Sequence, residues 1–272
     1  MTSFKALFDL KGRVAVVTGG CGILGRRFAD GLAEFGADVA IVDLDQATAD
    51  GVASELATRH AVRAEGFGCD ITSPEAVRAT ADAIETGLGT VSILLNNAAS
   101  KTRDIDAFFA PVETFAQETW REIMSVNLDG MFTVAQVFGG RMAERGYGSI
   151  VQTASIYGLM APDQRIYEGS EYLGRAINTP AVYTASKAGV IGLTKHLATY
   201  WAAKGVRVNT LTPGGVESGQ NDTFKQRYGN RVPLGRMARA DEMVGAMLYL
   251  VSDAAAYVTG QNIAVDGGLS AW

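Results

Sequence analysis

The chain has 272 residues, of which 47% are hydrophobic and 19% charged, and its formal net charge is −5. This length suits one large α/β domain or two small ones and allows a substantial buried core. The mild acidity, without a basic stripe, argues against a nucleic-acid partner. Two cysteines are too few for a disulfide framework, and two histidines without a nearby cysteine or carboxylate cluster argue against a metal site.

The first residues lack the apolar segment of a signal peptide. No apolar run approaches the roughly 18 residues that a membrane-spanning helix needs. We therefore expect a protein of the reducing cytoplasm with no membrane partner.

A short β-branched run, Val14–Thr18, predicts a buried parallel strand that leads into the glycine-rich stretch 19–25. Apolar residues at helical spacing follow, and Gly36 stops the helix they predict. A second apolar run at 39–42 then ends on Asp43. The order of strand, glycine loop, helix, strand and acid is that of a dinucleotide-binding βαβ unit.

Each part of this unit has its own physical role. Glycines let the backbone turn tightly and approach a pyrophosphate, which rests on the free N–H groups and positive end of the helix. The Asp43 carboxylate would accept hydrogen bonds from the adenosine ribose hydroxyls and would repel a 2′-phosphate. The sequence therefore predicts NAD as the cofactor in preference to NADP.

Helices and strands alternate through the rest of the chain. Further helices are expected at 46–60, after the Ser73-Pro74-Glu75 cap, at about 115–144, at 181–200 and at 241–252. Further strands are expected at 93–95, 149–155, 207–211 and 262–265, and another is expected to end at residue 70. Without a linker or repeat, this pattern predicts one α/β domain over 1–272. We expect a Rossmann-like doubly wound parallel sheet of about seven strands, with helices on both faces and the site at the carboxyl ends of the strands.

Tyr183 and Lys187 are four residues apart in the helical run 181–200, so their side chains share one face of the helix. A free tyrosine has a pKa near 10 and is a poor proton acceptor at neutral pH. A lysine beside it favours the phenolate and lowers this pKa, as acid–base catalysis requires. Taken alone, this spacing more often marks a surface tyrosine packed along a lysine stem.

The ordered set of motifs resembles the single-domain short-chain dehydrogenase/reductase family over essentially the whole chain. Thr18-Gly19 through Gly25 resembles the cofactor loop of the family, and Asn96-Asn97-Ala98-Ala99 resembles its N-N-A-G motif. Pro213-Gly214-Gly215 and the stretch 257–268 match later segments. Asn127, Ser155, Tyr183 and Lys187 fall on the catalytic tetrad.

The resemblance implies hydride transfer between nicotinamide and a carbinol or carbonyl carbon. Tyr183 would exchange the substrate proton, Lys187 would lower its pKa and hold the nicotinamide ribose, and Ser155 would bind the substrate oxygen. Asn127 would support a water-linked proton path. The implied cofactor-binding residues are Gly19, Gly22, Ile23, Leu24, Gly25, Asp43, Leu44, Asp70, Ile71, Asn97, Ala98, Ala99, Tyr183, Lys187, Pro213, Gly214 and Val216. The resemblance also implies a homo-oligomer, either a tetramer or a dimer, formed through the Tyr183 helix and the C-terminal strand.

The chain departs from the family pattern at three places. Ile23 stands where the family usually has a glycine of the cofactor loop, although Gly22 precedes it. Ala99 replaces the glycine of N-N-A-G. Ser155 and Tyr183 are 28 positions apart (183 − 155), which is farther than usual, so an insertion is expected at about 156–182, near the active site.

The segment 156–182 mixes polar side chains with tyrosines, a combination that suits a hydroxyl-rich ligand such as a sugar, sugar acid or polyol. Its polar and aromatic residues are Asp163, Gln164, Arg165, Glu168, Glu171, Arg175, Asn178, Tyr157, Tyr167 and Tyr172. Arg165 and Arg175 could clamp a carboxylate or phosphate. The alternative is that the charges form a solvated loop or a subunit contact.

The predicted function is therefore an NAD-dependent oxidoreductase that interconverts an alcohol and a ketone on a polar small molecule. One alternative is a reductase of another small carbonyl compound, of the 3-oxoacyl type. Another is a non-catalytic dinucleotide-binding sensor, which would be expected to have lost part of the tetrad, whereas this chain keeps all of it. A sugar-nucleotide epimerase or dehydratase would be expected to carry a further C-terminal substrate region.

Overall fold

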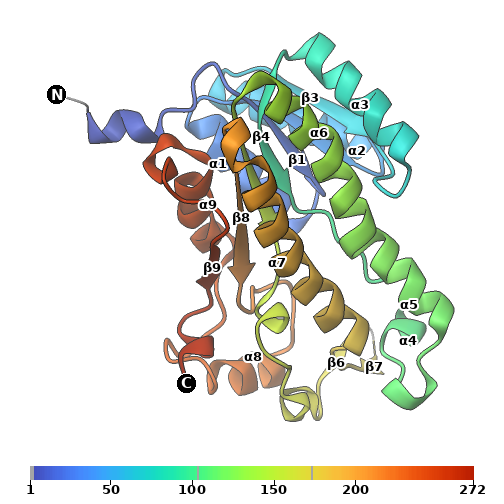
Figure 1. Cartoon of the computed structure of the whole chain (residues 1–272). Helices are drawn as coiled ribbons and strands as arrows, with labels where there is room; N and C mark the ends of the chain where they lie inside the picture. The colour runs from blue at the N-terminus through green and yellow to red at the C-terminus, as the bar shows by residue number, and fades with distance from the viewer. Residues whose placement is uncertain (1–2, 103, 173) are drawn as a thin grey trace.

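The computed structural model describes residues 3–102, 104–172 and 174–272, and its centre is a seven-stranded parallel sheet (Figure 1). The strand order is β3-β2-β1-β4-β5-β8-β9. The strands are β1 Val14–Thr18, β2 Asp38–Asp43, β3 Ala64–Gly68, β4 Val91–Asn96, β5 Gly148–Thr153, β8 Val206–Pro213 and β9 Asn262–Val265. From β1 to β3 the strands are added toward one edge of the sheet, and from β4 to β9 they are added toward the other. This strand order is that of a doubly wound sheet, so the predicted fold class is confirmed.

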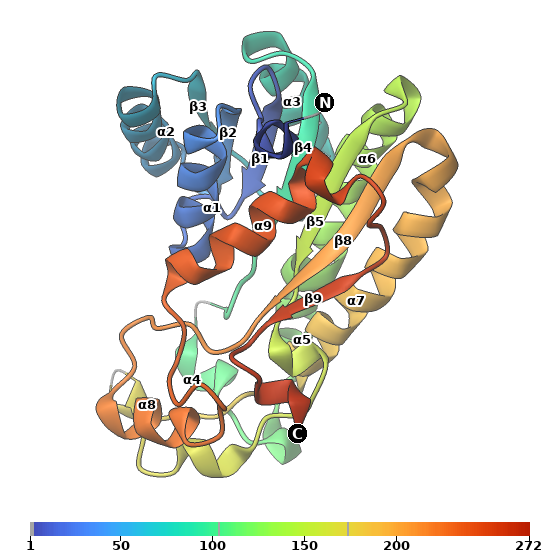
Figure 2. The same cartoon turned by 90° about the vertical axis from the view of Figure 1, so that its left-hand side faces the viewer.

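Helices cover both faces of this sheet. On one face lie α1 Ile23–Glu34, α2 Gln46–His60 and α9 Val244–Val251, and on the other lie α3 Pro74–Gly87, α6 Met131–Arg145 and α7 Ala181–Trp201. Figure 2 shows α1 and α9 side by side on one side of the sheet, with α7 on the far side of β8. The remaining α-helices are α4 Ile105–Phe108, α5 Gln117–Met124 and α8 Asp222–Gly229.

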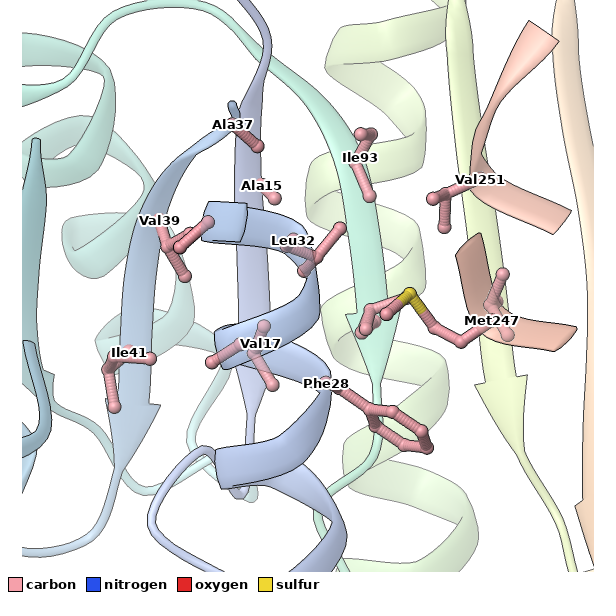
Figure 3. Packing of buried hydrophobic residues seen from close by; sticks show 14 of the residues in the cluster. Ala15, Val17, Phe28, Leu32, Ala37, Val39, Ile41, Ile93, Met247 and Val251 are labelled. Atoms are coloured by element: carbon pink, nitrogen blue, oxygen red, sulfur yellow. The ribbon is translucent and has the colours of Figure 1, made fainter. Parts of the chain in front are cut away.

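The alternation of side chains along β1 explains the three layers. Ala15 and Val17 pack under α1, where Figure 3 shows them beside Leu32, while Val14 and Val16 belong to the core on the opposite face. Successive strand residues point to opposite faces, so a strand buried on both sides is apolar throughout. Burying a side chain such as Leu32 contributes about 1.5–3 kcal/mol.

Short elements gather at the carboxyl ends of the strands. At this end lie α4, α5, α8 and a small antiparallel hairpin, β6 Glu171–Tyr172 with β7 Arg175–Ala176 (Figure 1). Short 3-10 turns occur at Phe4–Phe8, Val112–Thr114, Ile156–Gly158, Gln164–Tyr167, Ala202–Lys204, Ala240–Met243, Asp253–Ala255 and Leu269–Ala271. The end of the sheet where the sequence predicts a site therefore carries most of the irregular chain.

Several element boundaries differ from the sequence prediction, among them the ends of β5 and β3 and the start of α9. The strand expected to reach residue 155 ends at Thr153, because Ser155 instead accepts a hydrogen bond from the N–H of Tyr157 and caps the turn that follows. The strand expected to reach residue 70 ends at Gly68, where the Asp70 carboxylate begins a turn by accepting from the Thr72 N–H. The helix expected at 241–252 starts as a 3-10 turn and ends at Val251.

Candidate active site

Tyr183 lies in the first turn of α7, partly buried, and faces Ser155 across the end of the sheet. Burial raises the pKa of the Tyr183 phenol, and a hydrogen bond with the Ser155 side chain opposes part of this shift. Ser155 itself is 8% exposed. The two hydroxyls therefore form a largely dehydrated pair in which the phenol is protonated at neutral pH.

Lys187 lies one turn further along α7 and is only 3% exposed. Its Nζ donates a hydrogen bond to the backbone carbonyl of Thr153 at 3.1 Å and lies 6.0 Å from the centre of the Tyr183 ring. Burial lowers the pKa of the ammonium to about 8. The sequence predicted that this lysine would lower the pKa of Tyr183, whereas in the structure the pKa of the phenol is raised, mainly by burial.

Asn127 lies in a π-helical stretch, Ser125–Gly130, that joins α5 to α6. Its side chain is fully buried; Oδ1 accepts from the Ser100 N–H at 2.7 Å and Nδ2 donates to the Ser100 carbonyl at 3.3 Å. A wide π turn of this kind often marks a functional site. Asn127 thereby fixes the backbone of the loop after β4 where it passes the end of β5.

The glycine-rich loop between β1 and α1 is built from positions where a side chain would not fit. Gly19 has φ +63°, and a Cβ there would lie 2.8 Å from the Ala98 Cα. A Cβ on Gly25 would lie 2.1 Å from the Gly19 carbonyl oxygen. Gly22 precedes α1 and offers no side chain to cap it. The N–H groups of the first turn therefore face an open approach, which suits an anion.

Asp43 ends β2 at the rim of this loop. Its Oδ2 accepts from the Cys21 N–H at 2.9 Å and its Oδ1 accepts from the Leu44 N–H at 2.8 Å. An ionised carboxylate has about four acceptor positions, so both oxygens can still accept from a ligand. Ile23 and Leu44 are 53% and 71% exposed and lie at the edge of the same loop.

The other predicted cofactor residues follow the ends of neighbouring strands. After β4, the Asn97 side chain donates to the Thr18 carbonyl at 3.2 Å and the Ala98 N–H donates to the Thr18 hydroxyl at 3.1 Å. After β8, the Gly214 N–H donates to the Val265 carbonyl at 2.9 Å. The remaining positions lie on the same edge: Leu24 in the first turn of α1, Asp70 and Ile71 after β3, Ala99 after Ala98, Pro213 at the end of β8 and Val216 shortly after it.

Leu173 of the segment 156–182 lies outside the described residues, and the described part of the segment packs against α8 at the carboxyl ends of the strands. Ile156, Tyr157 and Ile166 share a buried cluster with Phe224 and Tyr228 of α8, and Tyr183 is packed against this cluster. The segment is therefore in contact with the candidate active site.

The two arginines of this segment are engaged elsewhere. Arg165 is 83% exposed and pairs with Asp163 at 2.8 Å, and Arg175 pairs with Asp106 of α4. Both guanidinium groups lie in surface ion pairs. This agrees with the alternative prediction, in which the charges of the segment belong to a solvated loop.

A groove of about 890 Å³ runs along α7 on the side away from Tyr183. Its walls include Trp120 of α5, Gln164 and Asn178 of the segment 156–182, and Thr184 and Ala185 of α7. Helical spacing places Thr184 and Ala185 on a different face from Tyr183 and Lys187. Tyr183 and Lys187 are not among the residues that line this groove.

Sequence reasoning missed the groups that hold the tetrad in place. The backbone of Ser100 holds Asn127, and the carbonyl of Thr153 holds Lys187. Thr18 holds the loop after β4 through its hydroxyl. A contact with a backbone group cannot be recognised in a sequence, so only the fold reveals the partners of Asn127 and Lys187.

Among the described residues, no group of three or more His, Cys, Asp and Glu side chains could hold a metal ion. Within the same residues, no helix has the length and apolar character that crossing a membrane requires.

Comparison with known proteins agrees with this geometry. A family model described as enoyl-(acyl carrier protein) reductase matches residues 22–270. D-threitol dehydrogenase of Mycolicibacterium smegmatis is 35% identical over 270 residues, covering 96% of this chain and 94% of that protein. Galactitol 2-dehydrogenase (L-tagatose-forming) of Cereibacter sphaeroides is 35% identical over 278 residues, covering 99% of each.

A solved structure of gluconate 5-dehydrogenase from Burkholderia cenocepacia, in complex with NADP and tartrate, superposes with a TM-score of 0.85. It is 34% identical and covers 98% of this chain and 99% of that one. The two relatives and this structure each cover at least 96% of this chain. The chain belongs to the short-chain dehydrogenase/reductase family and is an oxidoreductase of the class that acts on CH–OH groups.

Proposed function

We propose that this protein is an NAD-dependent oxidoreductase that interconverts a secondary alcohol and a ketone on a sugar, sugar acid or polyol. The observation that supports this most is the convergence of four side chains at one edge of the sheet. Tyr183 and Ser155 pair there, Lys187 is tied to the end of β5, and Asn127 holds the loop after β4. The glycine loop that precedes α1 lies at the same carboxyl edge of the sheet.

Each of these side chains has a role that its surroundings favour. Bound nicotinamide dinucleotide would accept or supply the hydride. Tyr183 would exchange a proton with the substrate oxygen, which Ser155 would hold through its hydroxyl. Lys187, a cation held on the same helix face, would favour the phenolate as the proton leaves and would bind the nicotinamide ribose. Asn127 would keep the Ser100 backbone in place and support the proton path.

The residues at the loop fit a dinucleotide. The first turn of α1 has no side-chain cap and could take a pyrophosphate on its N–H groups, while glycines leave room for the close approach. The Asp43 carboxylate at the rim could accept from the adenosine ribose hydroxyls. A 2′-phosphate there would bring two anionic groups together, which disfavours NADP. Ile23 and Leu44 offer exposed apolar surface on which an adenine ring could lie.

The substrate class rests on the relatives and on the segment 156–182. Relatives at 35% identity are named for threitol and galactitol, which are polyols. Beside Tyr183, this segment presents the phenols of Tyr157 and Tyr167 and the hydroxyl of Thr179, all of which can hydrogen-bond a polyol.

The test is a panel of polyols, sugars and sugar acids assayed for NADH formation, with threitol, galactitol and gluconate among them. We expect at least one of these to be oxidised, with NAD preferred to NADP, and we expect Tyr183→Phe to remove this activity. The proposal is wrong if no member of the panel is turned over by a folded enzyme that binds NADH.

A second candidate is a reductase of a 3-oxoacyl substrate, which is favoured by a relative named 3-oxoacyl-[acyl-carrier-protein] reductase, from Aquifex aeolicus, that is 32% identical over 264 residues. Such an enzyme would reduce acetoacetyl-CoA in the presence of NADH or NADPH. A kcat/KM for acetoacetyl-CoA above that for every polyol and sugar acid would establish this candidate in place of the first.

We further propose a cytoplasmic homo-oligomer, a tetramer or dimer. The cytoplasm suits the two free cysteines, Cys21 and Cys69. Trp272 is 79% exposed at the end of the chain and could contribute to a subunit contact, whereas Leu269 is buried within its own subunit. A monomer in light scattering at low concentration would contradict the oligomer.

A further inference from the structure

A group of hydrogen-bonded hydroxyls lies in the segment 156–182, and the backbone of one of its residues contacts Ser155. The backbone N–H of Tyr157 donates to the Ser155 hydroxyl at 3.3 Å. The phenol of Tyr167 donates to that of Tyr157 at 3.5 Å and also hydrogen-bonds the Thr179 hydroxyl. We call Tyr157, Tyr167 and Thr179 the hydroxyl chain. The backbone of Tyr157 links this group to Ser155, the residue proposed to hold the substrate oxygen.

Tyr167 lies close to the reacting centre. Its side chain and that of Tyr183 pack against the same buried cluster, and Tyr167 is near enough to influence the pKa of Tyr183 electrostatically. The hydroxyl chain is thus a neighbour of the group that would exchange the substrate proton.

The position of Tyr167 is fixed from several sides. Its ring packs on Phe224 of α8 with centroids 5.4 Å apart, and Phe224 packs on Tyr228 with centroids 5.9 Å apart. The guanidinium of Arg227 donates to the carbonyls of Arg165 and Glu168, which flank Tyr167 in the sequence. A side chain held in this way can discriminate between ligands by hydrogen bonding, because little conformational freedom is lost when a ligand binds.

The phenols of the hydroxyl chain act as hydrogen-bonding groups rather than as bases. Burial raises the pKa of both Tyr157 and Tyr167, so both stay neutral at physiological pH. A phenol donates one hydrogen bond and can accept two. After its contacts with Tyr157 and Thr179, Tyr167 keeps an acceptor position that a substrate hydroxyl can fill.

We infer that Tyr167 is a specificity-determining residue, which accepts a hydrogen bond from a second hydroxyl of the substrate while the first reacts at Tyr183. The inference rests on the proposed function and refines it: the enzyme selects substrates that carry a hydroxyl near the carbinol that is oxidised. A monohydric alcohol would leave this acceptor position unfilled in a largely buried site, and its transition state would bind less tightly.

The test compares butane-2,3-diol with butan-2-ol, which differ by one hydroxyl. For the wild type we expect kcat/KM to be higher for the diol. In Tyr167→Phe this preference should fall by about tenfold, the effect of one lost hydrogen bond, while kcat/KM for butan-2-ol stays within about twofold. NADH affinity and the unfolding temperature are measured for every variant to separate a local effect from a general loss of structure.

Two further variants strengthen the test. Thr179→Val removes the hydroxyl that orients Tyr167, so it should reduce the preference for the diol in the same direction and to a smaller extent. Tyr200→Phe is the matched control, because this phenol is 61% exposed near the far end of α7 and should leave both rates unchanged.

The outcomes distinguish this inference from the proposed function. A wild type that prefers the diol and keeps the preference in Tyr167→Phe overturns the role of Tyr167 and leaves the proposed function intact. An equal fall on both alcohols also overturns it, because that result indicates a general disturbance of the site. The wild type could also turn over butan-2-ol and the diol equally well, and turn over no polyol of the larger panel faster. That result contradicts both the proposed substrate class and the role of Tyr167.

Discussion

The Nζ of Lys187 donates a hydrogen bond to the backbone carbonyl of Thr153, at 3.1 Å. This contact joins the second turn of α7 to the last residue of β5, two positions before Ser155. A buried ammonium is costly unless it is hydrogen-bonded, and this carbonyl is its partner. This hydrogen bond therefore fixes the position of the helix that carries Tyr183 relative to the strand end that precedes Ser155.

The first prediction concerns the proton carrier. Tyr183→Phe keeps the ring and removes only the hydroxyl, so we expect kcat to fall by about a thousandfold or more, within the range for loss of an acid–base group. NADH affinity, measured by fluorescence titration, should change less than twofold. Tyr200→Phe on the same helix is the control and should retain full activity. If Tyr183→Phe turned over at a rate near that of the wild type, the assignment of the tetrad would be wrong.

The second prediction follows from the buried lysine. The pKa of Lys187 is about 8 in the folded protein against an ordinary value of 10.5, so between these values the unfolded chain binds more protons and stability rises with pH. Lys187→Met lacks this group. The unfolding free energy of the wild type relative to the variant should therefore rise by up to about 3 kcal/mol between roughly pH 7 and pH 10.

Urea unfolding of both proteins at the two pH values gives this difference directly. Groups that titrate alike in both proteins cancel in the comparison. If the difference in unfolding free energy between the two proteins did not depend on pH, the pKa of Lys187 would not be lowered in the folded state.

The third prediction concerns cofactor choice. The wild type should prefer NAD, and Asp43→Asn should raise the ratio of kcat/KM for NADP to that for NAD by tenfold or more, because the substitution removes the negative charge. Asparagine keeps a side-chain oxygen that can accept from the Cys21 N–H, so the loop should stay in place. Asp43→Ala, which loses both the charge and the acceptor, is the comparison. A wild type with the higher kcat/KM for NADP would refute the preference.

Much of the fold could be predicted from the sequence because its central strands are buried on both faces. Val14–Thr18, which is buried along its whole length, was predicted with the bounds that the structure has. The edge strand Asn262–Val265 was also predicted with these bounds, although it is only partly buried. The helix Gln46–His60 was also predicted residue by residue, where the Asp45 side chain caps the first turn. Continuous apolar runs and helix caps involve residues that are close together in the chain, so they can be recognised in a single sequence.

The elements missed were those that depend on distant contacts. The eight residues of α8 present only Phe224 and Tyr228 as large apolar groups, and these are buried against the segment 156–182, far away in sequence. The hairpin β6–β7 has two residues in each strand. Neither length nor periodicity identifies elements this small.

The candidate site shows the same division. Resemblance pointed to the tetrad, but the partner of Lys187 and the partner of Asn127 are backbone groups that only the fold brings near. The arginine clamp suggested by Arg165 and Arg175 could not be judged from the sequence. The carboxylate that engages Arg175 is Asp106, which lies 69 positions earlier in the chain (175 − 106).

The last prediction concerns the docking of the segment 156–182 on α8. Shortening this segment would remove Ile156, Tyr157 and Ile166 from a buried cluster, so a variant of that kind would expose apolar surface as well as alter the site. Arg227 offers a smaller change. Its guanidinium donates to the carbonyls of Arg165, at 3.1 Å, and of Glu168, and it lies at the surface of the cluster.

Arg227→Met keeps the aliphatic part of the side chain and removes both donors. Because Arg227 is 39% exposed, solvent offsets part of the loss, and we expect only a small decrease in stability. The KM for the best polyol should rise about tenfold, since Tyr167 would then be held less firmly beside the substrate, and NADH affinity should be unchanged. Arg78→Met is the control: that arginine is 53% exposed on α3 and pairs with Glu75. An unchanged KM in the Arg227 variant would mean that the segment keeps its place without this contact, and an equal loss of NADH affinity would mean that the substitution disturbs the cofactor site as well.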